Sequence, residues 1–187
     1  RFYERLEIRN ALAYLRLAQT RDDDPALERV LNTPPRGIGS KTVEKLREVA
    51  RAEQISLWRA IHRVREQSLL PARALTALAH FQSLIDDLDR ASETLPLDEL
   101  TEHVIEVSGL LDYHRSEKGE RGQARVENLQ ELQTATRLFE AEDETISPLQ
   151  AFLDSAALDS GEGQADPYED SIQMMTLHSA KGLEFPL

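Results

Sequence analysis

The sequence predicts a mainly α-helical protein, and three observations lead to that prediction. Apolar residues recur at the three- and four-residue spacings of helices over most of the chain. Residues that favour helix starts and ends separate these periodic segments. One short apolar stretch, IQMMTL at residues 172–177, has the character of a buried strand. Because a single strand is not stable by itself, we expect it to belong to a sheet that this chain does not contain.

Capping signals place the individual helices. Asp24 followed by Pro25 begins a short helix, Ser56 caps a later one, Pro71 starts a long one, and Gly109 ends another. In chain order, the expected helices cover residues 4–18, 24–31, 40–53, those from 56 onward, 71–92, 98–109, 121–141 and those after the cap at 147–148. Residues 159–170, DSGEGQADPYED, are predicted to form a flexible acidic loop.

The composition excludes several classes of function. The chain has 187 residues, of which 40% are hydrophobic, so it can bury one packed core. It has no cysteine, which excludes disulfides and thiolate metal sites. Aromatic residues make up 5%, too few for an extended base-stacking surface. No run of 18 apolar residues and no signal peptide occurs, so we expect a cytoplasmic protein without membrane contact.

The net charge of −12 is unevenly distributed along the chain. Residues 36–65 contain eight basic and three acidic residues, whereas residues 140–170 contain ten acidic residues and no basic one. A solvated helix face explains the acidic segment. A basic segment within an acidic protein indicates a local contact with a polyanion.

The sequence PRGIGSKT at residues 35–42 explains the location of that basic segment. Two glycines around Ile38 suit a tight hairpin between two helices, and they leave room for a phosphate to approach the backbone. We expect Ile38 to anchor the hairpin in the core, while the amides of residues 38–41 point outward at a helix N-terminus. Such a site binds duplex backbone without sequence preference. The predicted duplex-binding residues are Thr33, Arg36, Gly37, Ile38, Gly39, Ser40, Lys41, Thr42 and Lys45.

Other interpretations of these motifs were weighed. A nucleotide-binding P-loop is excluded because its lysine follows glycine directly, whereas Ser40 intervenes here, and no strand precedes the motif. An ordinary helix–helix turn remains an alternative. The acidic pair in LIDDL, residues 84–88, lies within a long helical pattern, so no metal site is predicted.

Four segments resemble superfamily 1 DNA helicases of the UvrD/PcrA/Rep group. MMTLHSAKGLEFP, residues 174–186, resembles helicase motif V, and RFYERLEIRNALAYLRL, residues 1–17, is similar to the segment after motif IV. NTPPRGIGSKT at 32–42 and EKGERGQARVENLQEL at 117–132 are also typical of the group. Their order and spacing match throughout, so the resemblance covers essentially the whole chain.

The resemblance implies a division of the chain. Such helicases have two RecA-like motor domains and two inserted subdomains, and the helical insertion between motifs IV and V is called 2B. Residues 1–5 then end a motor-domain connection, 6–170 form the 2B subdomain with its hairpin near 32–50, and 171–187 begin motor domain 2A. The chain lacks Walker A, Walker B and arginine-finger motifs, so no catalytic residue and no bound cofactor are expected in it. We expect Arg5, Glu7 and Arg9 to make ion pairs at the domain junction.

The resemblance also implies what the complete helicase does. It would use ATP and Mg²⁺ to move 3′ to 5′ along DNA in excision and mismatch repair, in the cytoplasm of bacteria near the nucleoid. By position, Thr176, His178 and Ser179 match contacts to the single strand, and Gly182 and Glu184 match nucleotide-binding positions. The expected partners are a single-strand/duplex junction and helicase domains 1A, 1B and 2A, with repair proteins or a second copy as further candidates. A protein-interaction or self-association module is the alternative function, and an independent enzyme is the least favoured.

Overall fold

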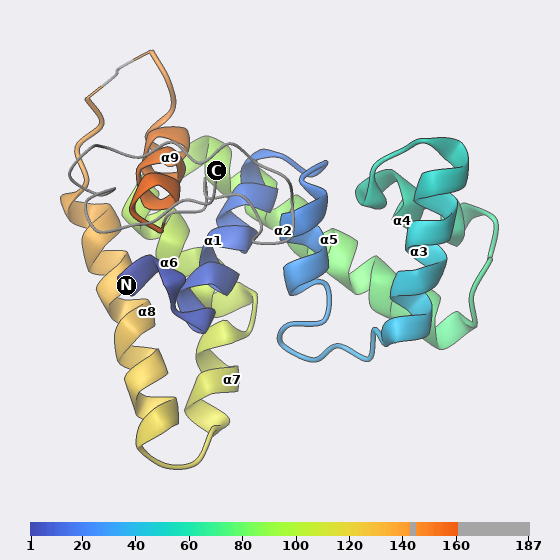
Figure 1. Cartoon of the computed structure of the whole chain (residues 1–187), viewed down its shortest axis with the longest axis horizontal. Coiled ribbons are helices and arrows are strands. Elements are labelled where there is room, and N and C mark those ends of the chain that lie inside the picture. Colours follow the sequence, from blue (N-terminus) through green and yellow to red (C-terminus); the bar gives the residue numbers. More distant parts are fainter. Residues whose placement is uncertain (143–144, 161–187) are drawn as a thin grey trace, which may run out of the picture.

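Helices make up the described part of the protein, residues 1–142 and 145–160, in the computed structural model (Figure 1). In chain order these are η1 (Phe2–Glu4), α1 (Leu6–Gln19), α2 (Asp24–Val30), α3 (Ser40–Glu53), α4 (Leu57–Glu66), α5 (Ala72–Thr94), α6 (Leu97–Val107), α7 (Leu110–Ser116), α8 (Glu120–Leu138) and α9 (Pro148–Ser160). No strand occurs among the described residues, and the mainly α prediction is confirmed. The strand predicted at 172–177 lies outside them. Of the acidic loop predicted at 159–170, residues 159 and 160 are instead the end of α9, and the other positions lie outside the described residues.

Most predicted caps have the expected geometry. The Ser56 hydroxyl accepts a hydrogen bond from the amide of Arg59 at 3.3 Å, and the Ser147 hydroxyl accepts one from the amide of Gln150 at 3.1 Å. Helix α3 has the predicted bounds. Local sequence determines these features, because each cap bonds to an amide three residues further along the chain.

Several helix ends differ by a few residues from the prediction, and two predicted caps have other roles. Asp23, and not Asp24, caps α2, because its carboxylate accepts from the Ala26 amide at 3.0 Å. Asp24 instead accepts from the Leu57 amide at 2.9 Å and so connects α2 to the start of α4. Gly109 ends α6 in a left-handed conformation, with φ of +82°, but it is also the N-cap of α7, a helix that the sequence analysis missed.

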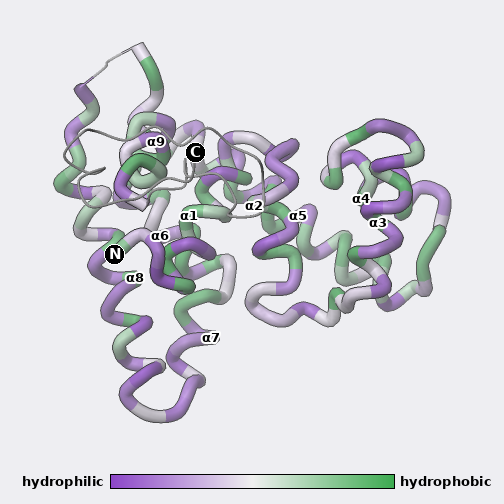
Figure 2. The backbone as a smooth tube through the Cα atoms, in the orientation of Figure 1, coloured by the Kyte–Doolittle hydropathy of each residue, from purple (hydrophilic) through white to green (hydrophobic). Residues whose placement is uncertain are grey.

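Helix α1 is the centre of the structure, and α2, α5, α6 and α8 pack around it. Most of its residues are buried, which requires a helix that is apolar on nearly every side. Helices α3 and α4 form a smaller lobe at the far end of the long helix α5 (Figure 1). Figure 2 shows hydrophilic and hydrophobic residues interleaved along outer helices such as α8, as expected where one face is buried.

Polar contacts join the start of α1 to α8. Arg5 lies 3.9 Å from the Glu131 carboxylate, and Glu7 accepts a hydrogen bond from Asn128 at 2.6 Å. Arg125 places its Nε atom 3.7 Å from the other Glu7 oxygen. The expectation that Arg5 and Glu7 make ion pairs is therefore confirmed.

The turn between α7 and α8 requires a glycine at position 122. A Cβ atom there would lie 2.5 Å from the Glu117 carbonyl oxygen and 2.8 Å from that of His114. The Glu117 side chain holds the same turn together, with contacts of 2.8 Å to His114 and 2.6 Å to Arg125. The hydrogen bond with His114, supported by Arg125, lowers the pKa of the Glu117 carboxyl.

We therefore expect Gly122→Ala to lower the free energy of unfolding by about 1–3 kcal/mol, the usual cost of overpacking against atoms that cannot move aside. Gly39→Ala is the matched control, because no atom lies within 4 Å of that position and its φ of −86° suits alanine. Urea unfolding of the two variants measures the difference. Equal stabilities would contradict the close approach at Gly122.

Candidate nucleic-acid interface

The loop between α2 and α3 carries the two glycines of the predicted hairpin. Gly37 has a φ of +77°, a left-handed conformation that residues with a side chain adopt only rarely. Gly39 is extended instead, with φ of −86° and ψ of 177°, so the backbone does not require glycine there. No atom lies within 4 Å of the place that a Cβ atom would occupy on Gly39. The surface beside Gly39 is therefore open to an approaching group.

Asn32 sets the shape of this loop. Its Oδ1 atom accepts hydrogen bonds from the amides of Arg36, at 2.7 Å, and Ile38, at 3.2 Å. The Ile38 side chain is only 2% exposed and packs in the core, which confirms its predicted role as an anchor. The prediction that the Ile38 amide points outward is wrong, because that amide is bonded to Asn32.

Three consecutive amides remain unbonded at the start of α3. The N-cap of the helix is Gly39, which has no side chain to accept from the first turn. Among the described residues, no hydrogen bond is made by the amides of Gly39, Ser40 or Lys41, whereas those of Thr42 and Val43 donate to the Gly39 carbonyl. Residues 39–41 are all exposed. Free amides at a helix N-terminus, together with the helix dipole, favour the binding of an anion.

The side chains of the predicted site separate into an exposed and an inward group. Lys41 is exposed and makes no ion pair with any described residue, so its charge is available beside the free amides. Lys45, one turn further along α3, pairs with a glutamate of the same helix at 3.0 Å. Thr42 is 7% exposed, and Thr33 is half-buried. Residues 39–41 therefore lie at the surface, whereas the two threonines are wholly or partly covered.

Arg36 points into the protein. Its guanidinium donates to three carbonyl oxygens and one hydroxyl, those of Val30 (2.9 Å), Pro34 (3.1 Å), Ser108 (2.9 Å) and Tyr14. It also lies 5.6 Å from the ring centres of both Tyr14 and Phe81. Both Nη atoms of Arg36 therefore donate within the protein, whereas a contact of this side chain with DNA stays a prediction.

Sequence reasoning missed two residues that shape this site, Asn32 and Tyr14. The Tyr14 hydroxyl donates to the Thr33 carbonyl and accepts from Arg36. Asn32 precedes TPP, and asparagine side chains often bond to backbone further along a turn, so this signal was available. Tyr14 lies in a helical pattern and has no comparable local signal.

Acidic residues neutralise part of the basic segment at 36–65. Arg47 makes two hydrogen bonds to Glu28, at 2.7 and 2.8 Å, and these lower the pKa of the Glu28 carboxyl. Arg63 bonds to Glu53 at 2.8 Å. The basic side chains of this segment for which the described residues provide neither an ion pair nor a hydrogen bond are those of Lys41, Arg51 and Arg59.

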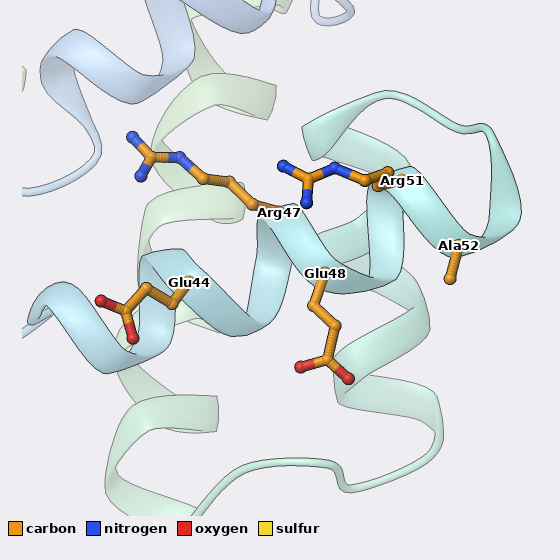
Figure 3. Close-up of a pocket in the computed structure, with 5 residues that line it drawn as sticks. All are labelled: Glu44, Arg47, Glu48, Arg51 and Ala52. Atoms are coloured by element: carbon orange, nitrogen blue, oxygen red, sulfur yellow. The ribbon is translucent and has the colours of Figure 1, made fainter.

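A shallow depression on α3 lies beside this surface and is lined by Glu44, Arg47, Glu48, Arg51 and Ala52 (Figure 3). Figure 3 shows the two guanidinium groups on one side of the helix and the two carboxylates on the other. Groups of both signs line it, so the depression does not select an anion. The start of α3 has the better geometry for a phosphate.

The described ranges contain neither a metal site nor a membrane span. No group of three or more His, Cys, Asp or Glu residues that could hold a metal ion occurs there. No described helix is both long and apolar enough to cross a membrane. The predicted single-strand residues Thr176, His178 and Ser179, and the predicted nucleotide residues Gly182 and Glu184, lie outside the described residues.

The described part of the chain is helical, with exposed and unbonded amides at the start of α3, and comparison with known proteins shows to which family the chain belongs. Residues 1–187 match the family of UvrD-like helicase C-terminal domains. The match covers the entire chain, so the chain belongs to this family. The resemblance seen in its motifs is thereby confirmed.

Three curated relatives are similar to the whole chain. DNA helicase II of Escherichia coli K12 is 53% identical over 188 residues, and DNA helicase II of Haemophilus influenzae is 52% identical. The ATP-dependent DNA helicase PcrA of Bacillus subtilis is 38% identical over 195 residues. These values agree with the segment GEGQAD, residues 161–166, which indicates greater similarity to UvrD than to PcrA. The chain spans about a quarter of each relative, 26% of its length.

Burial raises the pKa of the Tyr14 phenol from 10.0 to about 12, although the adjacent Arg36 guanidinium opposes that rise. The unfolded chain therefore loses this proton at lower pH than the folded protein, so stability falls as the pH rises from 10 toward 12. We expect the stability advantage of the wild type over Tyr14→Phe to shrink by about 2–3 kcal/mol across that interval, at about 1.4 kcal/mol per pH unit.

Urea unfolding at a series of pH values between 9 and 12 tests this expectation. Tyr113→Phe is the control, since it removes a phenol hydroxyl from a ring that lies at the surface. A Tyr14→Phe curve that runs parallel to that of the wild type would show that the phenol is not buried as described.

Proposed function

We propose that this chain is the 2B subdomain of a UvrD-like, ATP-dependent DNA helicase, with adjoining segments of motor domain 2A. In this proposal, the start of α3 holds the backbone of the duplex ahead of the motor. The observation that carries it is the row of three exposed, unbonded amides at Gly39, Ser40 and Lys41. Membership of a helicase family makes DNA the anion of interest.

The geometry suits phosphate better than base edges. Backbone amides and one lysine can donate to phosphate oxygens, which carry no sequence information. The unbonded amides of residues 39–41 only donate, so they suit phosphate oxygens better than the mixed donor and acceptor patterns of base edges. Binding by this surface should therefore be independent of DNA sequence. It should also be weak in the isolated chain, because few of the basic side chains nearby lack an acidic partner.

The names of the relatives suggest the activity of the complete protein. They are called DNA helicase II and ATP-dependent DNA helicase PcrA. We propose that the complete protein uses ATP and Mg²⁺ for 3′–5′ unwinding in DNA repair, with Thr176, His178 and Ser179 near the single strand and Gly182 and Glu184 near the nucleotide. We expect no ATP hydrolysis from the 187-residue chain itself.

The two ends of the described helical body lie together. Helix η1 packs against α9, and the Arg1 guanidinium donates to the Asp159 carbonyl at 3.3 Å. An insertion whose two connections to a motor domain are adjacent can turn as a rigid body about them. We propose that such turning regulates unwinding by bringing the start of α3 to the duplex or moving it away.

We expect Gly39→Val to weaken duplex binding at least several-fold while the fold is retained, because φ and ψ at this position suit valine but its side chain blocks the approach of a phosphate. Lys41→Ala should reduce the slope of log affinity against log salt by about 0.9, the value for one lost phosphate contact. Fluorescence anisotropy with a labelled duplex, over a range of salt concentrations, measures both effects.

Lys118→Ala is the charge-matched control, since Lys118 is an exposed lysine in the turn between α7 and α8. It should leave affinity and salt slope nearly unchanged. If Gly39→Val binds the duplex as tightly as the wild type, or if Lys41→Ala and Lys118→Ala behave alike, the start of α3 is only a turn.

A further inference from the structure

We infer that Arg36 is a positioning residue for duplex binding: its half-buried guanidinium holds the loop between α2 and α3 so that the amides of residues 39–41 face the DNA. This inference rests on the proposed function of that surface. It assigns to Arg36 a role different from the direct DNA contact that the sequence predicted.

The acceptors of Arg36 come from four separate parts of the fold. Pro34 belongs to the loop itself and Val30 to the end of α2, whereas Tyr14 lies on α1 and Ser108 caps the C-terminus of α6. One side chain therefore ties the loop to two helices of the larger body. Ser108 is 72 residues further along the chain, so no local turn could replace this connection.

Hydrogen bonds to Asn32 connect the backbone of Arg36 to the residue before the free amides. The amide of Arg36 donates to Asn32 Oδ1, and the same oxygen accepts from the amide of Ile38. Ile38 directly precedes Gly39, the first of the three unbonded residues. A guanidinium fixed at position 36 and a buried side chain at position 38 together leave the backbone at 39 little freedom.

The arrangement of acceptors requires arginine at position 36. Four acceptors from different elements surround the guanidinium, and only arginine has five N–H donors in a rigid planar fork. Lysine has one ammonium group and cannot reach all of them at once. The ring faces of Tyr14 and Phe81 near the guanidinium also suit a planar cation better than a compact one.

A loop held in place by Arg36 lowers the entropic cost of binding a phosphate. A loop that is already held in the binding conformation loses little freedom when it takes a phosphate, whereas a loosened loop must be ordered first. Without Arg36, the amides and Lys41 would no longer act together on the same phosphates.

The test is a double-mutant cycle on the full 187-residue chain, measured as duplex affinity at low salt. We expect Arg36→Met to weaken binding by about tenfold, and Lys41→Ala to weaken it several-fold in the wild type but almost not at all in Arg36→Met. Arg36→Lys keeps the charge and should show the same loss of coupling. Circular dichroism establishes that each variant retains its helices.

Leu129→Ala, a core substitution in α8, is the stability control, because it lowers stability without touching the loop. It should leave duplex affinity and the Lys41 effect unchanged. Three results would each overturn the positioning role. The effects of Arg36→Met and Lys41→Ala on affinity could be additive, or Arg36→Lys could bind the duplex fully. Leu129→Ala could also lose as much duplex affinity as Arg36→Met. The proposed function fails separately, if Lys41→Ala and Gly39→Val have no effect in the wild-type background. Should Arg36→Met fail to fold, the Arg36→Lys cycle decides the question.

Discussion

The hydrogen bonds of the half-buried Arg36 guanidinium are the interaction on which the position of the α2–α3 loop depends. Removing a cation from water is costly unless its donors find acceptors, and here four N–H groups donate to oxygens. The acceptors are neutral carbonyls and a phenol, so the positive charge is solvated by dipoles of the protein. The loop can therefore be irregular in backbone and still be fixed with respect to α1 and α6.

Folding leaves less available positive charge in the basic segment than its sequence suggests. Charge counted along the sequence suggested a broad basic surface at residues 36–65, but folding brings Glu28 of α2 to Arg47 and turns Arg36 inward. What remains at the start of α3 is a small site, three amides and the charge of Lys41. Under the proposed function, so small a site would hold a duplex loosely enough for the duplex to advance.

Local features of the fold could be predicted from the sequence, and features that depend on distant partners could not. The bounds of α3 and the caps at Ser56 and Ser147 follow from neighbouring residues. The choice between Asp23 and Asp24 as the cap of α2 could not be made locally, because Leu57 of α4 takes the second carboxylate. The orientation of Arg36 depends in the same way on oxygens contributed by separate helices, so the sequence around the two glycines could not show that this side chain bonds within the protein.

The central claim is that the amides of residues 39–41 bind phosphates of duplex DNA. Nuclear magnetic resonance of the ¹⁵N-labelled chain, titrated with short duplexes of two unrelated sequences, tests it most directly. We predict that the amide signals of Gly39, Ser40 and Lys41 shift and saturate in the same way with both duplexes, while that of Ile38, bonded to Asn32, moves less. Unshifted signals at these three positions, with shifts elsewhere on the protein, would contradict the account.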